Sequence, residues 1–257
     1  MQGMAERTGR AYRLTAPALA LLATFAAPAF ATEEIRVVET LAIPVGVARV
    51  EGDRSHALRL SLYSFRGARW SNEEIAAAAL ESAGLLGQCG VVLKRAELRV
   101  LEAPRRFHVY FTPVSRELLR QLPVAKPAVF FVADTRNVPA FDAEAIGRGN
   151  AATRPELADT VWVAHGARDL PLALAHELVH VLSDSGEHSD EPGNLMRAET
   201  SPQNTRLTEA QCERLRSRGA ANGLLRRQRA RLTVTGEKLT RRTSARRLAA
   251  SSPSTIS

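Results

Sequence analysis

Three residues at fixed spacing are the most chemically informative part of the sequence: His176, Glu177 and His180, in "LPLALAHELVHVL". A spacing of four places both imidazoles on one face of a helix, where they can hold one ion at Zn–N distances of about 2.0 to 2.1 Å. Glu177 would then stand beside the ion, where a general base can take a proton from a zinc-bound water. The pattern predicts a catalytic zinc site; the alternative is two core histidines bonded to backbone groups and an unrelated glutamate.

A catalytic zinc site uses three protein ligands, and the residues after the helix offer the third. Gly186 permits a sharp reversal of the chain, and His188 follows it closely. We therefore expect His176, His180 and His188 to bind Zn²⁺. A carboxylate can also bind zinc, so three acidic residues nearby remain competitors for the third position: Asp184, Glu187 and Asp190.

The stretch "HELVHVL…GEHSDEPGNLM" resembles the metzincin clan of zinc endopeptidases, and its order of His-Ser, Pro and Leu-Met is especially similar to the matrixins. The resemblance implies a zincin-like fold. It also implies ligand roles for His176, His180 and His188, a general-base role for Glu177, and a place for Met196 in the turn beneath the metal.

The sequence departs from the metzincin pattern in its spacing. The usual motif is H-E-x-x-H-x-x-G-x-x-H, whereas the third histidine here comes two residues later, with Ser183 at the glycine position. Some metzincins also have a tyrosine ligand two residues after the methionine, and Ala198 stands there. The longer spacer keeps the competing third ligands open, and no tyrosine ligand is expected.

The elements around the motif alternate between strand and helix patterns, which predicts one α+β domain with a mixed twisted sheet, a backing helix, an active-site helix and a C-terminal helix. Helices are expected at 71–89, near 115–122, at 170–182 and at 207–218, the first and last with capping-box pairs. Strands are expected at 33–50, 56–65, 91–103, 106–113, 127–134 and 160–167. The strand at 127–134 is apolar throughout and should be buried on both faces.

Other residues with possible roles are less specific. His108 and His165 lie in strand patterns without metal spacing to a neighbour, so we expect structural roles for them. The segment from Thr135 to Asp159 is expected to be loop plus an edge strand. Its Gly147-Arg148-Gly149-Asn150 stretch either borders an edge strand that pairs with an extended substrate or is a plain flexible loop.

The first 31 residues have the pattern of an export signal. A basic start precedes an uncharged run, and Ala29-Phe30-Ala31 forms a small-x-small cleavage site. A single membrane anchor is the alternative, but prolines interrupt the run. The mature chain is expected to begin near Thr32 and to be periplasmic or secreted.

The net charge of +8 is unevenly distributed. Residues 214–257 carry eleven Arg, one Lys and one Glu, and residues 32–213 are mildly acidic. We expect the catalytic domain to span 32–219 and residues 220–257 to form a basic, disordered tail. The tail has no motif of a nucleic-acid module, but clustered Arg could contact polyanions or an anionic membrane surface.

Cys89 and Cys212 are the only cysteines in the chain. An oxidising compartment would keep a bond between them, so the export signal favours a disulfide, with two buried free thiols as the alternative.

Together these features predict an exported zinc-dependent endopeptidase that hydrolyses peptide bonds through a water activated by Glu177 and zinc. Two alternatives remain: a zinc-stabilised, non-catalytic binding protein, and a polyanion-binding protein that acts through the Arg-rich tail. The expected partner is a peptide or protein substrate, and the chain is expected to be a monomer.

Overall fold

The computed structural model describes residues 34–46, 55–136 and 143–228. The predicted signal peptide and residues 229–257 of the predicted tail lie outside the described residues. Within the described part, no helix combines the length and the apolarity needed to cross a membrane.

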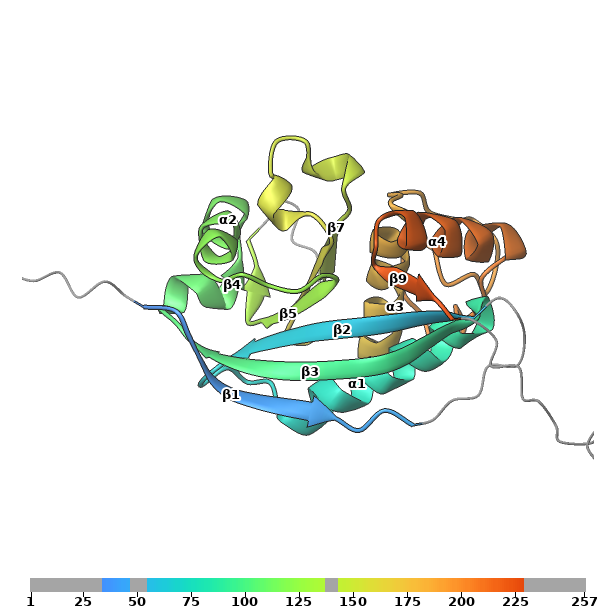
Figure 1. Ribbon diagram of the computed structural model, residues 1–257. Coiled ribbons are helices and arrows are strands. Elements are labelled where there is room, and N and C mark those ends of the chain that lie inside the picture. The colour runs from blue at the N-terminus through green and yellow to red at the C-terminus, as the bar shows by residue number, and fades with distance from the viewer. Residues whose placement is uncertain (1–33, 47–54, 137–142, 229–257) are drawn as a thin grey trace, which may run out of the picture. The chain divides into compact units, whose positions relative to one another are not determined.

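One mixed sheet forms the centre of the domain, in the order β1-β3-β2-β5-β8-β7, with β9 beside β2 (Figure 1). The strands β3, β2, β5 and β8 pair in parallel, whereas β1 and β7 close the two edges in antiparallel pairing. Their bounds are β1 Arg36–Ile43, β2 His56–Phe65, β3 Val91–Glu102, β5 Ala128–Val132, β7 Ala143–Ile146, β8 Thr160–Ala164 and β9 Leu225–Arg227. The predicted α+β class with a mixed sheet is confirmed.

The α-helices are α1 Asn72–Leu86, α2 Thr112–Gln121, α3 Leu170–Ser183 and α4 Glu209–Ala221. Short 3₁₀ turns lie at Gly87–Cys89, Arg105–His108, Gly149–Ala151 and Pro155–Leu157. The Ser71 hydroxyl caps α1 by accepting the Glu74 N–H, and Thr208 and Gln211 form a complete capping box at α4. Both helix starts therefore lie where the sequence predicts them.

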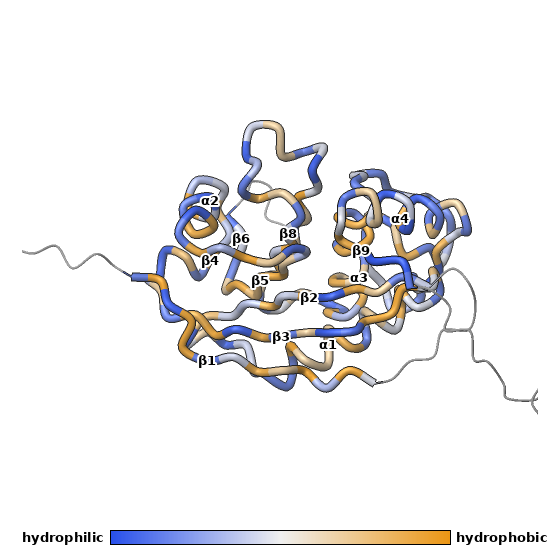
Figure 2. Tube along the Cα trace, in the orientation of Figure 1, coloured by the Kyte–Doolittle hydropathy of each residue, from blue (hydrophilic) through white to orange (hydrophobic). Residues whose placement is uncertain are grey.

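Each face of the sheet has its own hydrophobic core. Strand β5 shows the division, because Val129 and Phe131 pack with α1 and α3, whereas Phe130 and Val132 pack with α2. All five residues of β5 are buried, as the apolar run predicts. Figure 2 colours this strand as hydrophobic.

The predicted strand at 106–113 is wrong. The chain forms a 3₁₀ turn and then only the two-residue strand β4, Val109–Tyr110, which pairs with β6, Asp134–Thr135. The buried residues Phe107 and Tyr110 are three apart, which is not the spacing of one strand face. Pro113 lies in the first turn of α2, where its fixed φ suits a helix start.

The folded part also continues past Gly219, where the sequence pattern predicted its end. Helix α4 runs on to Ala221, and β9 then pairs antiparallel with β2. Gly219 does not cap the helix; a Cβ there would lie 2.8 Å from Leu225 Cδ1, so the glycine allows β9 to pack against α4. The chain is therefore ordered by the sheet up to Arg227.

Cys89 and Cys212 form a disulfide, as predicted, with their Cα atoms 4.8 Å apart. The bond joins the end of the 3₁₀ turn after α1 to the first turn of α4, and the two cysteines are 123 residues apart in sequence. It therefore ties the helix at the C-terminal end of the domain to the helix that backs the sheet.

Replacing both cysteines with alanine should lower the free energy of unfolding by about 2–5 kcal/mol, because the bond closes a long loop in the unfolded chain. Urea unfolding of the oxidised protein and the double variant would measure this. An unchanged midpoint would contradict the prediction, and adding a reductant to the variant should have no further effect.

Candidate metal centre

Helix α3 holds two of the predicted ligands. Pro171 lies in its first turn, and ten of its fourteen residues are buried between the sheet, α1 and α4. His176 and His180 are 4% and 9% exposed, and their ring centroids are 4.6 Å apart. A helix buried on most of its surface thus presents two imidazoles together on one face.

Backbone carbonyls orient both imidazoles. His176 Nδ1 lies 2.8 Å from Leu195 O, and His180 Nδ1 lies 2.7 Å from Ser185 O. A carbonyl oxygen can only accept, so each Nδ1 must be the donor and each neutral ring carries its lone pair on Nε2. The carbonyls therefore set the tautomer that a metal-binding histidine needs.

The two Nε2 atoms face each other at 2.9 Å. Because both rings carry their hydrogen on Nδ1, the two Nε2 lone pairs point at each other and repel. A cation between them would remove this repulsion. Tetrahedral zinc would place two such nitrogens about 3.3 Å apart, close to the distance found. The donor set fits a zinc ion.

His188 completes the cluster. The ligand atoms of the three histidines lie within 4.8 Å of one another, and the His188 ring is 5.3 Å from that of His176 and 4.9 Å from that of His180. His188 is exposed, so it closes the group from the solvent side.

Two of the competing carboxylates are bound elsewhere. Asp184 Oδ1 accepts the Gly149 N–H at 2.8 Å, and Glu187 forms an ion pair with Arg214 on α4. Asp190 is exposed, and the cluster of possible metal ligands among the described residues does not include it. The geometry favours three histidines over a mixed donor set.

Burial keeps the two helix histidines neutral. Burial lowers the pKa of His176, although its bond to Leu195 opposes the shift. The pKa of His180 falls to about 4, first through burial and then through the proximity of His176. Both rings are thus neutral at pH 7, with the proton on Nδ1 and Nε2 free to bind metal.

Glu177 is half-buried and lies against the edge strand β7. Its pKa is raised to about 8, mainly by burial and also by the nearby Glu144 carboxylate, whereas a hydrogen bond from the Ala145 backbone opposes the rise. A cation held by the histidines would favour the ionised carboxylate and lower this pKa again. The side chain that could act as a base is therefore tied to the edge strand β7.

Met196 is buried in the same hydrophobic core as the apolar residues of α3. Its N–H donates to Asn194 Oδ1 at 2.9 Å, and the Asn194 amide also bonds Gln211 at the start of α4. Leu195, whose carbonyl orients His176, lies between these two residues. The turn containing Met196 is thus held by α4 and in turn orients the His176 ring.

A cleft of about 620 Å³ opens over the histidines and Glu177. One wall is the edge strand β7 and the residues after it, Gly147 and Gly149; another contains Ala198 and Glu199. The Gly147–Asn150 stretch does border an edge strand, as one of the two sequence interpretations expected.

The remaining histidines with predicted structural roles lie outside this cluster. His108 Nε2 bonds Ala103 O at 3.1 Å, and its ring stacks on Phe65. The His165 ring packs against the Trp70 ring in a T-shaped arrangement, with the ring centroids 5.1 Å apart.

The sequence did not reveal the groups that orient the site. These are the carbonyls of Leu195 and Ser185 and the Ala145 backbone; the Glu144 carboxylate, which raises the pKa of Glu177, was missed as well. Backbone groups leave no trace in residue type, so only the chain's path could show them. Glu144 lay in a segment whose pattern fixed no strand register.

Comparison with known proteins gives structural likeness only. No protein-family model matches the chain, and no curated protein matches it. Metalloproteinase-II from Bacteroides fragilis is similar at 17% identity and a TM-score of 0.47, over 69% of this chain and 57% of that one. Archaemetzincin from Methanopyrus kandleri is similar at 15% identity and a TM-score of 0.41, over 63% of this chain and 95% of that one. The present chain thus spans a little over half of the Bacteroides protein.

Proposed function

We propose that the protein is an exported zinc-dependent endopeptidase of metzincin type. The observation that carries the proposal is the convergence of His176 and His180 Nε2 lone pairs with His188, beside a carboxylate that contacts the cleft wall. The disulfide supports an oxidising, exported location, periplasmic or secreted.

His176, His180 and His188 would hold the ion. When bound, zinc would supply Lewis acidity, polarising a peptide carbonyl and lowering the pKa of water to about 7. Glu177 would take a proton from the attacking water as its oxygen bonds to the carbonyl carbon, and would then deliver that proton to the leaving amine as the C–N bond breaks. The first products are a carboxylic acid and an amine, which exchange the water's second proton to become a carboxylate and an ammonium group at neutral pH, and Glu177 returns to its starting state.

Strand β7 would position the substrate. It pairs only with β8 among the described strands, and its residues Ala143, Glu144 and Ala145 line the cleft. An extended peptide can add to such an edge by backbone hydrogen bonds, which would align a scissile bond over the histidines. The small alanine side chains leave the cleft wall open to the peptide.

The purified mature protein should contain about one zinc ion per chain and cleave peptides from an unbiased library. Removal of zinc by a chelator should abolish cleavage, and added Zn²⁺ should restore it. Elemental analysis and mass spectrometry of the products measure the two results.

Other outcomes of this experiment separate the alternatives. Full zinc occupancy without cleavage would favour a zinc-stabilised binding protein. Absence of zinc, with salt-sensitive polyanion binding that is lost on deletion of residues 229–257, would favour a role for the tail. The deletion should begin after Gln228, because β9 belongs to the sheet.

A further inference from the structure

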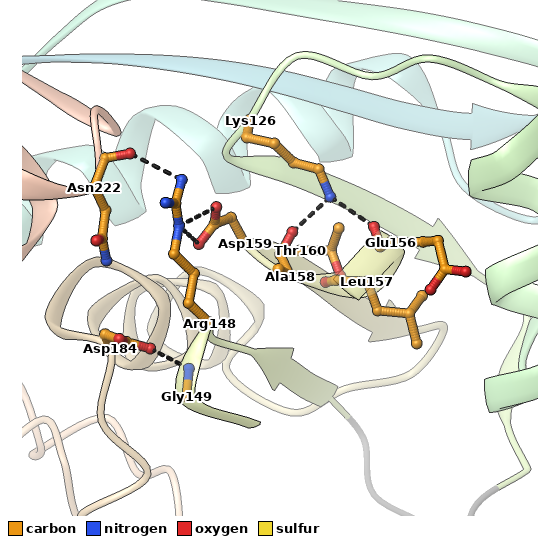
Figure 3. Close-up of polar contacts among 10 residues, drawn as sticks. All are labelled: Lys126, Arg148, Gly149, Glu156, Leu157, Ala158, Asp159, Thr160, Asp184 and Asn222. Atoms are coloured by element: carbon orange, nitrogen blue, oxygen red, sulfur yellow. Dashed lines mark hydrogen bonds and ion pairs between the residues drawn. The ribbon is translucent and has the colours of Figure 1, made fainter. Parts of the chain in front are cut away.

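The residues that follow β7 are held against the end of α3 (Figure 3). The Gly149 N–H donates to Asp184 Oδ1 at 2.8 Å, and a Cβ at Gly147 would lie 3.0 Å from the same oxygen. Glycine at 147 therefore lets the carboxylate approach closely. Two residues of the cleft wall thus contact one side chain, which lies 35 positions after Gly149 in the sequence.

Arg148 anchors this segment on its other side. Its Nε bonds the Asp159 carboxylate at 2.9 Å, and its Nη2 donates to Asn222 O at 3.0 Å (Figure 3). The Asp159 side chain is only 4% exposed, and a carboxylate so buried needs a charged partner. The segment is thereby fixed to the start of β8 and the end of α4, and the Asp184 side chain links it to the end of α3.

Asp184 also begins the loop that shapes the histidine cluster. It ends α3 in a left-handed conformation, with φ of 50°. The next residue, Ser185, provides the carbonyl that orients His180, and His188 follows three positions later. A shift of Asp184 would move both features.

We propose that Asp184 is a positioning residue that fixes the cleft wall at Gly147–Asn150 to the loop containing Ser185 and His188. The inference rests on the proposed function, because it assigns the loop a role in holding zinc. Asp184 is not itself a ligand; its Oδ1 is occupied by the Gly149 N–H. This Gly149–Asp184 contact, here called the clamp, couples the peptide-binding wall of the cleft to the histidine cluster that would bind the metal.

Two substitutions at one position separate the side-chain bond from the backbone conformation. Asp184→Gly adopts positive φ without strain but removes the acceptor, whereas Asp184→Asn tolerates positive φ and keeps an acceptor oxygen. Zinc affinity is measured by competition with a chelator, and KM and kcat are measured at saturating zinc on an extended peptide.

Asp184→Gly should weaken zinc binding about tenfold, as loss of an outer-shell partner does. It should also raise KM with little change in kcat. Asp184→Asn should keep the zinc affinity and KM within about twofold of the unmodified protein. Unchanged values in Asp184→Gly, or equal impairment in both variants, would overturn the inference. If the unmodified protein binds zinc but cleaves nothing, only the proposed function fails, and the two zinc affinities still test Asp184.

A second pair of variants approaches the clamp from the other side. Gly147→Ala should push the Asp184 carboxylate away and weaken zinc binding in the same direction, whereas Gly46→Ala should not, because nothing lies within 4 Å of a Cβ there. In the Asp184→Gly background, Gly147→Ala should have no further effect on zinc affinity. Additive effects of the two changes would contradict a shared contact.

Discussion

Replacing Glu177 with glutamine should reduce kcat for peptide cleavage by about 10²- to 10⁴-fold while leaving zinc bound. Glutamine has the same shape and can still accept the hydrogen bond from the Ala145 backbone, so the cleft wall should stay in place. It cannot take a proton from water at neutral pH, so the variant loses the base and little else. Steady-state kinetics and elemental analysis of the same preparation measure the two effects.

The matched control is Glu81→Gln, an exposed glutamate on α1 that takes no part in the cleft. It removes the same charge and should keep full activity and full zinc content. A Glu177→Gln variant with unreduced kcat would reject the base assignment. A variant that loses both zinc and activity would show instead that Glu177 supports the metal site structurally.

The sequence predicts the site better than the path of the chain around it. The spacing of His176, Glu177 and His180 is local, and helix geometry converts it directly into a shared face. The position of His188 depends on a loop two residues longer than the H-E-x-x-H-x-x-G-x-x-H pattern, and residue types alone could not resolve its path. The structure brings it to the cluster because α3 ends at Asp184 and the chain reverses there.

The same contrast holds for the fold. An apolar run in the sequence predicts strand β5, and capping pairs predict the starts of helices α1 and α4. Strand β9 does not, because "LRR" has one buried residue and owes its existence to pairing with β2. Tertiary pairing of this kind overrides weak local preference.

Substitution of His188, on the loop after α3, is the clearest test of metal binding. His176 and His180 are buried, so their removal would disturb the core as well as the ligand set. His188 is exposed, and His188→Ala should therefore leave the fold intact. Losing one of three ligands should weaken zinc binding by more than about a hundredfold, beyond the usual effect of an outer-shell change.

Zinc should also raise the melting temperature of the unmodified protein, since it binds only the folded chain, and His188→Ala should lose that rise. The matched variant is Glu187→Ala, which removes the neighbouring carboxylate, already paired with Arg214, and should keep both zinc and the rise. Zinc retained in His188→Ala but lost in Glu187→Ala would move the third ligand to the carboxylate. Such a result would require the Glu187–Arg214 ion pair to break as the metal binds, because one carboxylate would have to turn from α4 toward the cleft.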